Sequence, residues 1–312
     1  MKLVKSVLSA SILAAASQTA VAVETDVSAS IRVAYIGGDG HDSAPVAGET
    51  GWHDAYSNVT FNASEDLGST KLSYQFSLWA DPTGSLDNDM NEKGVRTHFI
   101  QLSGDFGAVS YGENWSPFYN AIIWGHGADR FNGYYTGYNV PGFDSRTTDT
   151  VFYSSPNMNG LQISASVGTD ATSKKHGERK FEDHREIAVT YQVNDVVSVA
   201  AAMTDGAQDE QKDKGIGISY KKDSITLNAN YMTTEEGGAW YSGDYTNLYG
   251  QYDVNDKTTL RATIGWADEG YVGDSYTLGA SHQYSDSVRV FAEYYSDDTG
   301  NYPSVGLRVD ID

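Results

Sequence analysis

The stretch KKDSITLNANY, residues 221–231, sets apolar and polar side chains in strict alternation after a short charged turn. The apolar positions 225, 227, 229 and 231 fall on one face of a β-strand, and the polar positions between them fall on the other. The same period of two recurs at residues 161–167, 260–266 and 288–294. The chain is therefore predicted to consist of strands whose two faces meet different surroundings.

The connections between these strands alternate in length. Tight turns such as NMNG at 157–160 alternate with longer polar segments, among them SDDTGN at 296–301 and a very long one from Trp115 to about Thr147. Counting the strands gives 16, an even number. A membrane β-barrel explains this organisation, because its apolar faces meet lipid, its polar faces line a wet lumen, and closure satisfies every backbone hydrogen bond. A soluble β-sandwich is the weaker alternative. We predict an all-β fold, a 16-stranded antiparallel transmembrane β-barrel.

The N-terminal segment differs from the rest of the chain. Lys2 and Lys5 provide positive charge, an apolar run covers residues 7–16, and a small-residue Ala-Val-Ala site ends at Ala22. This pattern predicts a secretory signal peptide at residues 1–22 and leaves residues 23–312 for the barrel. The chain has no cysteine, which excludes disulfides and zinc–thiolate sites, and its net charge of −21 disfavours binding to nucleic acid.

Three longer segments carry a resemblance to a known family. They are YSNVTFNASEDLG at 56–68, RTHFIQLSGDFGAVSYGEN at 96–114 and TDTVFYSSPNMNGL at 148–161. With the alternating organisation, they resemble the general porins of Gram-negative outer membranes. The resemblance implies a homotrimer in the outer membrane, in contact with lipid and lipopolysaccharide, with a long third loop folded into the lumen. It implies no enzyme activity and no cofactor.

The resemblance also implies a ladder of positive residues at the pore constriction. Arg32, Arg96 and Arg146 stand at matching positions, while Asn58 stands where the family usually carries arginine. Strand parity gives an independent expectation. Arg32 and Asn58 alternate with apolar neighbours and therefore face the lumen. Arg96 is expected to face the lumen because Thr97 and Phe99 share the opposite face.

The third loop departs from the family pattern. Its segment WGHGADRFNG, residues 124–133, replaces the usual Pro-Glu-Phe-Gly-Gly, and Arg130 takes the place of the glutamate. His126, Asp129 and Arg130 are therefore expected near the loop tip, at the constriction. A few residues around 120–124 are compatible with a helix. The loop is rich in aromatic residues, which either pack it against the inner wall or offer a stacking track for sugar rings.

Two further departures concern assembly. Glu113 stands where the family usually carries arginine, and it shares strand parity with Val109 and Tyr111. It is therefore expected to point toward the wall or a neighbouring subunit, with a role in assembly or selectivity. At the C-terminus, Ile311 takes the place of the family's terminal aromatic residue, which puts assembly efficiency in question.

We predict an outer-membrane channel for passive diffusion of small hydrophilic solutes and ions. One alternative is a substrate-specific porin of the oligosaccharide type, and another is a structural or adhesive barrel without an open pore. The seven histidines form no metalloprotease or zinc pattern, so an enzyme is disfavoured and no metal site is assigned. The segment LDNDMNE, residues 86–92, is a weak calcium candidate that is better explained as a solvated loop. Ion preference stays open, because the acidic surface favours cations and the arginines favour anions.

Overall fold

The structure is a computed structural model that describes residues 23–38, 50–83, 94–127, 131–132, 145–168, 171–173, 179–181, 184–205, 212–235, 243–268 and 273–312. The predicted signal peptide lies outside these residues. The strands are β1 (Glu24–Ile36), β2 (Gly51–Asp54), β3 (Asn58–Asp66), β4 (Thr70–Trp79), β5 (Val95–Gly104), β6 (Gly107–Trp115), β7 (Arg146–Ser154), β8 (Leu161–Gly168), β9 (Ala171–Ser173), β10 (Arg179–Phe181), β11 (Arg185–Gln192), β12 (Val197–Asp205), β13 (Lys212–Lys222), β14 (Ile225–Glu235), β15 (Gly243–Asn255), β16 (Thr258–Ala267), β17 (Ser275–Gln283), β18 (Val288–Asp297) and β19 (Gly300–Ile311). One short π-helix, η2 (Tyr119–Gly125), follows β6.

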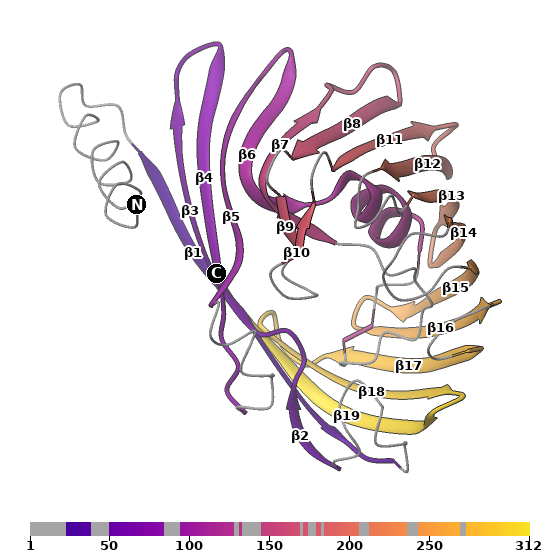
Figure 1. Ribbon diagram of the computed structural model, residues 1–312. Helices are drawn as coiled ribbons and strands as arrows, with labels where there is room; N and C mark the ends of the chain where they lie inside the picture. The colour runs from indigo at the N-terminus through magenta and orange to yellow at the C-terminus, as the bar shows by residue number, and fades with distance from the viewer. Residues whose placement is uncertain are drawn as a thin grey trace.

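All the strands belong to one antiparallel sheet that closes on itself (Figure 1). The closing pair is β1 with β19, which runs from Ala29 opposite Ile311 to Ile36 opposite Ser304. Strands β2 and β3 both pair with β1 and act as one interrupted strand, and the β9–β10 hairpin continues the β8–β11 pair. Sixteen strands then form the wall, which confirms the predicted barrel.

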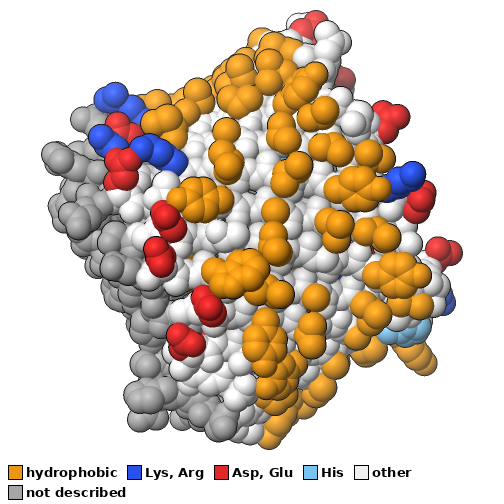
Figure 2. Space-filling model, turned by 90° about the vertical axis from the view of Figure 1, so that its right-hand side faces the viewer, with side chains coloured by type: hydrophobic (Ala, Val, Ile, Leu, Met, Phe, Trp, Pro, Cys, Tyr) orange, Lys and Arg blue, Asp and Glu red, His pale blue; other side chains and the backbone are white. Residues whose placement is uncertain are grey.

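The two faces of the wall have opposite character. On β14 the outward Leu227 is 50% exposed, whereas the inward Asn228 and Asn230 are each 4% exposed. Figure 2 shows hydrophobic side chains spread over the middle of the outer wall, with charged side chains at its rims. A water-soluble sandwich would bury the apolar face instead. The exposed apolar wall suits lipid, and the polar face lines the interior.

The connections follow the predicted alternation with one correction. The segment 296–301, expected to be one of the longer connections, closes as a two-residue turn at Asp298 and Thr299. The carboxylate of Asp297 accepts hydrogen bonds from the backbone N–H groups of Thr299 and Gly300, so the turn satisfies its own donors. In the part of the chain that the structure describes, no helix is long and apolar enough to cross a membrane. The calcium candidate at 86–92 lies outside that part.

Candidate functional site

Near its end, before the chain enters the barrel interior, β6 contains a backbone position that requires glycine. Gly112 has a φ of +134°, and a Cβ there would lie 2.2 Å from the carbonyl oxygen of His98 on β5. The pairing of β6 with β7 shifts register between Gly112 and Asn114. Beyond the strand, the hydroxyl of Ser116 accepts the backbone N–H of Tyr119, at 3.0 Å, and starts the helical turn.

The helix η2 then lies against the inner wall on the far side of the barrel. Its element contacts are with β11, β12 and β13. In a ring of 16 strands β12 lies eight positions from β1, so this wall is opposite the seam where β1 meets β19 (Figure 1). An apolar cluster joins the loop to the wall and comprises Phe118, Tyr119, Ala121, Ile122 and Ile123 from the loop and Ala188, Ala200, Ala202, Met232 and Tyr245 from the strands.

Polar side chains of the wall anchor the loop backbone. Asn230 donates to the carbonyl of Ile122 (3.1 Å), and Asn228 donates to the carbonyl of Gly127 (2.8 Å). Glu186, which is buried, accepts the backbone N–H of Phe118 at 3.0 Å. These bonds replace the water that a solvated loop would use, and they fix the loop in position.

Two lumen-facing glycines of β13 leave room for the loop. A Cβ at Gly217 would lie 2.4 Å from the Cβ of His126. A Cβ at Gly215 would lie 2.9 Å from the ring of Phe118 and 3.1 Å from Ile122. The loop therefore packs directly on the backbone of this strand. A side chain larger than the hydrogen of glycine would prevent this contact.

His126 is placed differently from the expectation. Its ring is buried between the loop and β12, where Nδ1 donates to the carbonyl of Ala121 (2.7 Å) and Nε2 lies 3.0 Å from the hydroxyl of Ser198. It is therefore a contact between loop and wall, and the expectation of a constriction position is wrong for this residue. Asp129 and Arg130 lie outside the described residues.

The loop meets the wall again at Phe131 and Asn132. The ring of Phe131 packs edge-on against Tyr249 of β15, with centroids 6.2 Å apart. The backbone N–H of Asn132 donates to Glu293 of β18 at 2.7 Å, and its side-chain oxygen accepts from Arg289 at 3.4 Å. Phe118 and Phe131 thus pack the loop against the wall, which is one of the two roles expected for its aromatic residues.

Two arginines and two tryptophans form a compact group on the interior face. The guanidinium of Arg96 lies 5.3 Å from the ring centre of Trp79 and 4.9 Å from that of Trp115. The guanidinium of Arg146 lies 5.2 Å and 5.1 Å from the same two rings and donates to the carbonyl of Arg96 at 2.6 Å. Cation–π contacts hold both charges close together despite their repulsion.

Arg96 lies on the interior face because of a β-bulge, and not because of the strand parity on which the expectation was based. Thr97 does not face lipid, because it is fully buried and donates to the inward Gln75 at 3.1 Å. The register between β4 and β5 shifts at this point, where Ser77 pairs with Thr97 and Leu78 pairs with Val95. Arg96 is the extra residue of this bulge, and bulges redirect side chains. Simple parity cannot predict its direction.

Asn58 has the predicted inward orientation. It pairs with Trp79 across β3 and β4, and its amide donates to the carbonyl of Tyr56 at 3.1 Å. This part of the wall therefore carries an amide beside the aromatic ring of Trp79, where the resemblance implies a positive charge.

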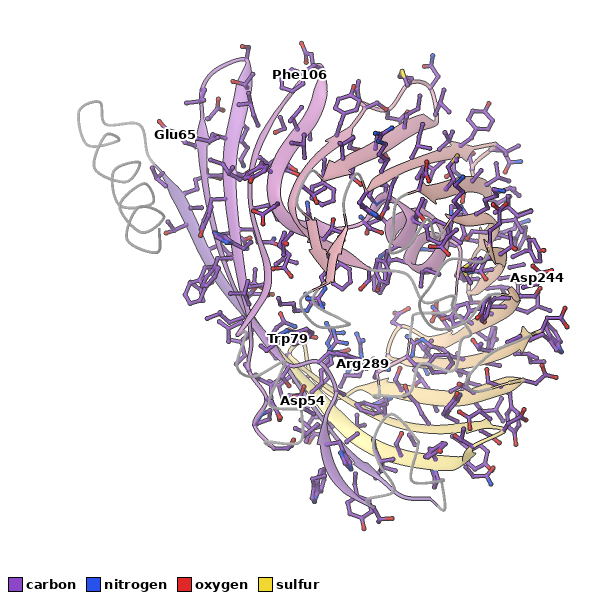
Figure 3. The ribbon with its side chains drawn as sticks, in the orientation of Figure 1. Asp54, Glu65, Trp79, Phe106, Asp244 and Arg289 are labelled. Atoms are coloured by element: carbon purple, nitrogen blue, oxygen red, sulfur yellow. The ribbon has the colours of Figure 1, made fainter. Side chains whose placement is uncertain are left out.

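A second basic group crosses the seam of the barrel, and the sequence reasoning named only Arg32 among its members. Arg32 of β1 lies directly opposite Arg308 of β19, and Arg308 lies directly opposite Arg289 of β18. Arg261 of β16 donates to the hydroxyl of Ser281 on β17, two residues from Gln283, which lies directly opposite Arg289. Figure 3 shows Trp79 and Arg289 inside the ring of strands, whereas Asp244 lies outside it. A usable signal existed, because Arg261 and Arg289 occupy the polar faces of the alternating segments 260–266 and 288–294.

Glu113 is buried and lies beside an outward-facing histidine. It is 5% exposed and pairs with His98 of β5. The ring of His98 makes edge contacts with Tyr74 and Phe76, each with centroids 5.5 Å apart, and Tyr74 is among the exposed outer residues. The pairing of β6 with β7 skips Glu113, between Gly112 and Asn114, so parity alone does not fix the direction of its side chain.

The comparisons with known proteins agree with this architecture. A family model described as Gram-negative porin matches residues 7–302. A porin of Fuscovulum blasticum is 30% identical over 122 residues, which cover 38% of this chain and 41% of that protein, less than half the relative's length.

Solved porin structures share the fold at low identity. The anion-selective porin from Comamonas acidovorans has a TM-score of 0.69 and 16% identity, over 93% of this chain and 100% of that chain. OmpF of Salmonella typhi, in a complex with daunomycin, has a TM-score of 0.71 and 15% identity, over 93% of this chain and 97% of that chain. Because the family model covers nearly the whole sequence, the chain belongs to the Gram-negative porin family, whose members are channel proteins of the outer membrane.

Proposed function

We propose that this protein is a channel for passive diffusion of small hydrophilic solutes and ions across the outer membrane. The observation that carries the proposal is the arrangement of the interior. The anchored helix η2 lies against β11–β13, Arg32 lies on β1 at the opposite side of the ring, and Arg96 and Arg146 lie on β5 and β7 in the wall between them. A polar interior narrowed by a fixed loop and lined by charge on one side selects solutes by size and charge.

We further propose that the channel is a homotrimer surrounded by outer-membrane lipid and lipopolysaccharide. Support comes from the family and from the outer face at His98, where an exposed polar ring interrupts the apolar wall. A planar-bilayer recording tests both proposals. We expect current to close in three equal steps. Absence of any conductance contradicts the channel, and closure in single steps contradicts the trimer.

Removing the tryptophan-bound arginines is expected to shift ion preference. In the double variant Arg96→Gln/Arg146→Gln we expect the chloride-to-potassium permeability ratio to fall roughly five- to tenfold, because charges near an ion path contribute on the order of 1 kcal/mol in a wet pore. The measurement is the reversal potential in a salt gradient. Lys71→Gln/Lys222→Gln removes the same charge from exposed positions and serves as the control. An unchanged ratio in the arginine variant contradicts a role in the constriction.

Glu113→Arg is expected to weaken assembly. The substitution places a longer, positive side chain at a buried position, and an unpaired buried charge is strongly unfavourable. The measurement is the temperature at which trimers dissociate on a native gel, with Glu65→Arg on the exterior of β3 as the control. If the trimer is unaffected but the reversal potential shifts, Glu113 acts on selectivity instead.

The oligosaccharide-specific alternative has a separate test. Liposome swelling rates that depend only on solute size support a general channel, whereas saturable rates and sugar-blocked current support a specific one. If liposomes that contain the protein swell with none of the solutes, the result favours the structural barrel without an open pore.

A further inference from the structure

Arg261 and Arg289 carry positive charges that are held in place by neutral groups. Arg261 donates to the hydroxyl of Ser281 at 2.8 Å. Arg289 donates to the side-chain oxygens of Gln283 at 3.0 Å and Asn132 at 3.4 Å. Within the described ranges, neither guanidinium forms an ion pair with a carboxylate. Each is oriented without being neutralised.

The neighbouring carboxylates offset only part of the charge of the three arginines Arg261, Arg289 and Arg308. Asp310 accepts two bonds from Nε of Arg308, at 2.7 and 2.8 Å. Glu293 accepts the backbone N–H of Asn132 and is nearly fully buried. The group of Arg261, Arg289 and Arg308 therefore keeps an excess of positive charge on the interior wall.

This arrangement costs stability unless an anion offsets it. Arg308 and Arg289 are directly opposite on adjacent strands, where like charges repel. Arg261 and Arg289 donate to Ser281 and Gln283, which lie two residues apart on the same face of β17. The hydrogen bonds that the guanidiniums donate to Ser281, Gln283 and Asn132 restrict their motion before a ligand binds, which lowers the entropic cost of binding.

We propose that Arg261, Arg289 and Arg308 form a saturable binding station for solutes with an oxyanion group, of the phosphate or carboxylate class. Guanidinium N–H groups match the oxygens of such groups in pairs, which favours them over chloride. Asn132 brings the third loop into the station through its bond to Arg289. The proposal rests on the proposed function, since it names a solute class for the same channel.

The test uses inorganic phosphate as the probe and the full-length protein. In planar bilayers we expect phosphate to block chloride current with saturation. In Arg261→Gln/Arg289→Gln we expect the apparent affinity for phosphate to fall about tenfold, as for the loss of charge-assisted hydrogen bonds. Lys222→Gln/Lys257→Gln, which removes two charges from exposed turns, should keep the wild-type affinity.

Arg289→Lys separates binding from simple charge. It keeps the positive charge and loses the paired donors, so it should leave the chloride-to-potassium permeability ratio unchanged and lower the affinity for phosphate. Chloride current that phosphate never saturates, or a block that the double variant leaves intact, overturns the proposal. Titration calorimetry on the detergent-solubilised protein keeps the two hypotheses apart. Phosphate binding without any conductance refutes the channel and supports the binding station. Conductance without phosphate binding supports the channel and refutes the binding station.

Discussion

Gly217→Leu is expected to turn a steady open channel into one whose current flickers between levels. A Cβ at this position already lies 2.4 Å from the Cβ of His126, so a leucine side chain forces the loop away from β13. Overpacking of this kind costs about 1–3 kcal/mol, which shifts a docking equilibrium roughly 5- to 150-fold. Displacement also breaks the bond from Asn228 to the carbonyl of Gly127. Single-channel recording measures the loss of the stable level.

The control for this variant is Gly250→Leu. Gly250 lies on the outer face of β15, where a Cβ meets only the side chain of Leu227 at 3.6 Å. The same substitution there leaves the loop untouched and should preserve the steady current. If both variants conduct alike, the third loop is not held by its contact with β13.

Leu278→Arg is expected to destabilise the barrel by about 2–4 kcal/mol, the cost of arginine at the middle of a bilayer on a lipid-facing strand. Leu278 is 56% exposed on the outer face of β17. The measurement is the free energy of unfolding in urea in the presence of lipid vesicles, extrapolated to zero denaturant.

Two variants make this prediction specific. Leu278→Ala removes the side chain without adding charge and should cost less. Asn62→Arg places the same guanidinium on the inward face of β3, beside Asp26, with which Asn62 already forms a hydrogen bond of 3.2 Å. We expect little loss there, because the inward face is wet. Equal costs at positions 62 and 278 contradict the assignment of the two faces.

The fold could be predicted from the sequence because its signal is local. Alternation at 225–231 assigns both faces of β14 without knowledge of any partner, and the turn pattern gives the number of strands. Parity assigns Arg32 and Asn58 to the inward face for the same reason. Arg96 lies on the interior face, but the parity argument that led to this expectation fails, since its direction depends on a bulge created by pairing with β4.

The rest of the site depends on contacts between distant segments. His126 is buried because β12 and β13 lie behind it, and no local pattern encodes that neighbour. The opposition of Arg32 and Arg308 arises only because the first and last strands meet. Two glutamates hold the loop, Glu186 and Glu293. Their local sequence does not distinguish them from other polar residues of the strands.

The pairing of β1 with β19 also sets an order of events in folding. These strands are the most distant in sequence, so closure of the loop between them carries the largest entropic cost and is expected to be the slow step. Until the last strand is in place, β1 presents an unpaired edge that a second chain could occupy. Closure then brings Arg308 against Arg32, and Asp310 arrives on the same strand to offset that charge. The strand that brings Arg308 next to Arg32 therefore also brings the carboxylate of Asp310, which offsets the repulsion between the two arginines as soon as the barrel closes.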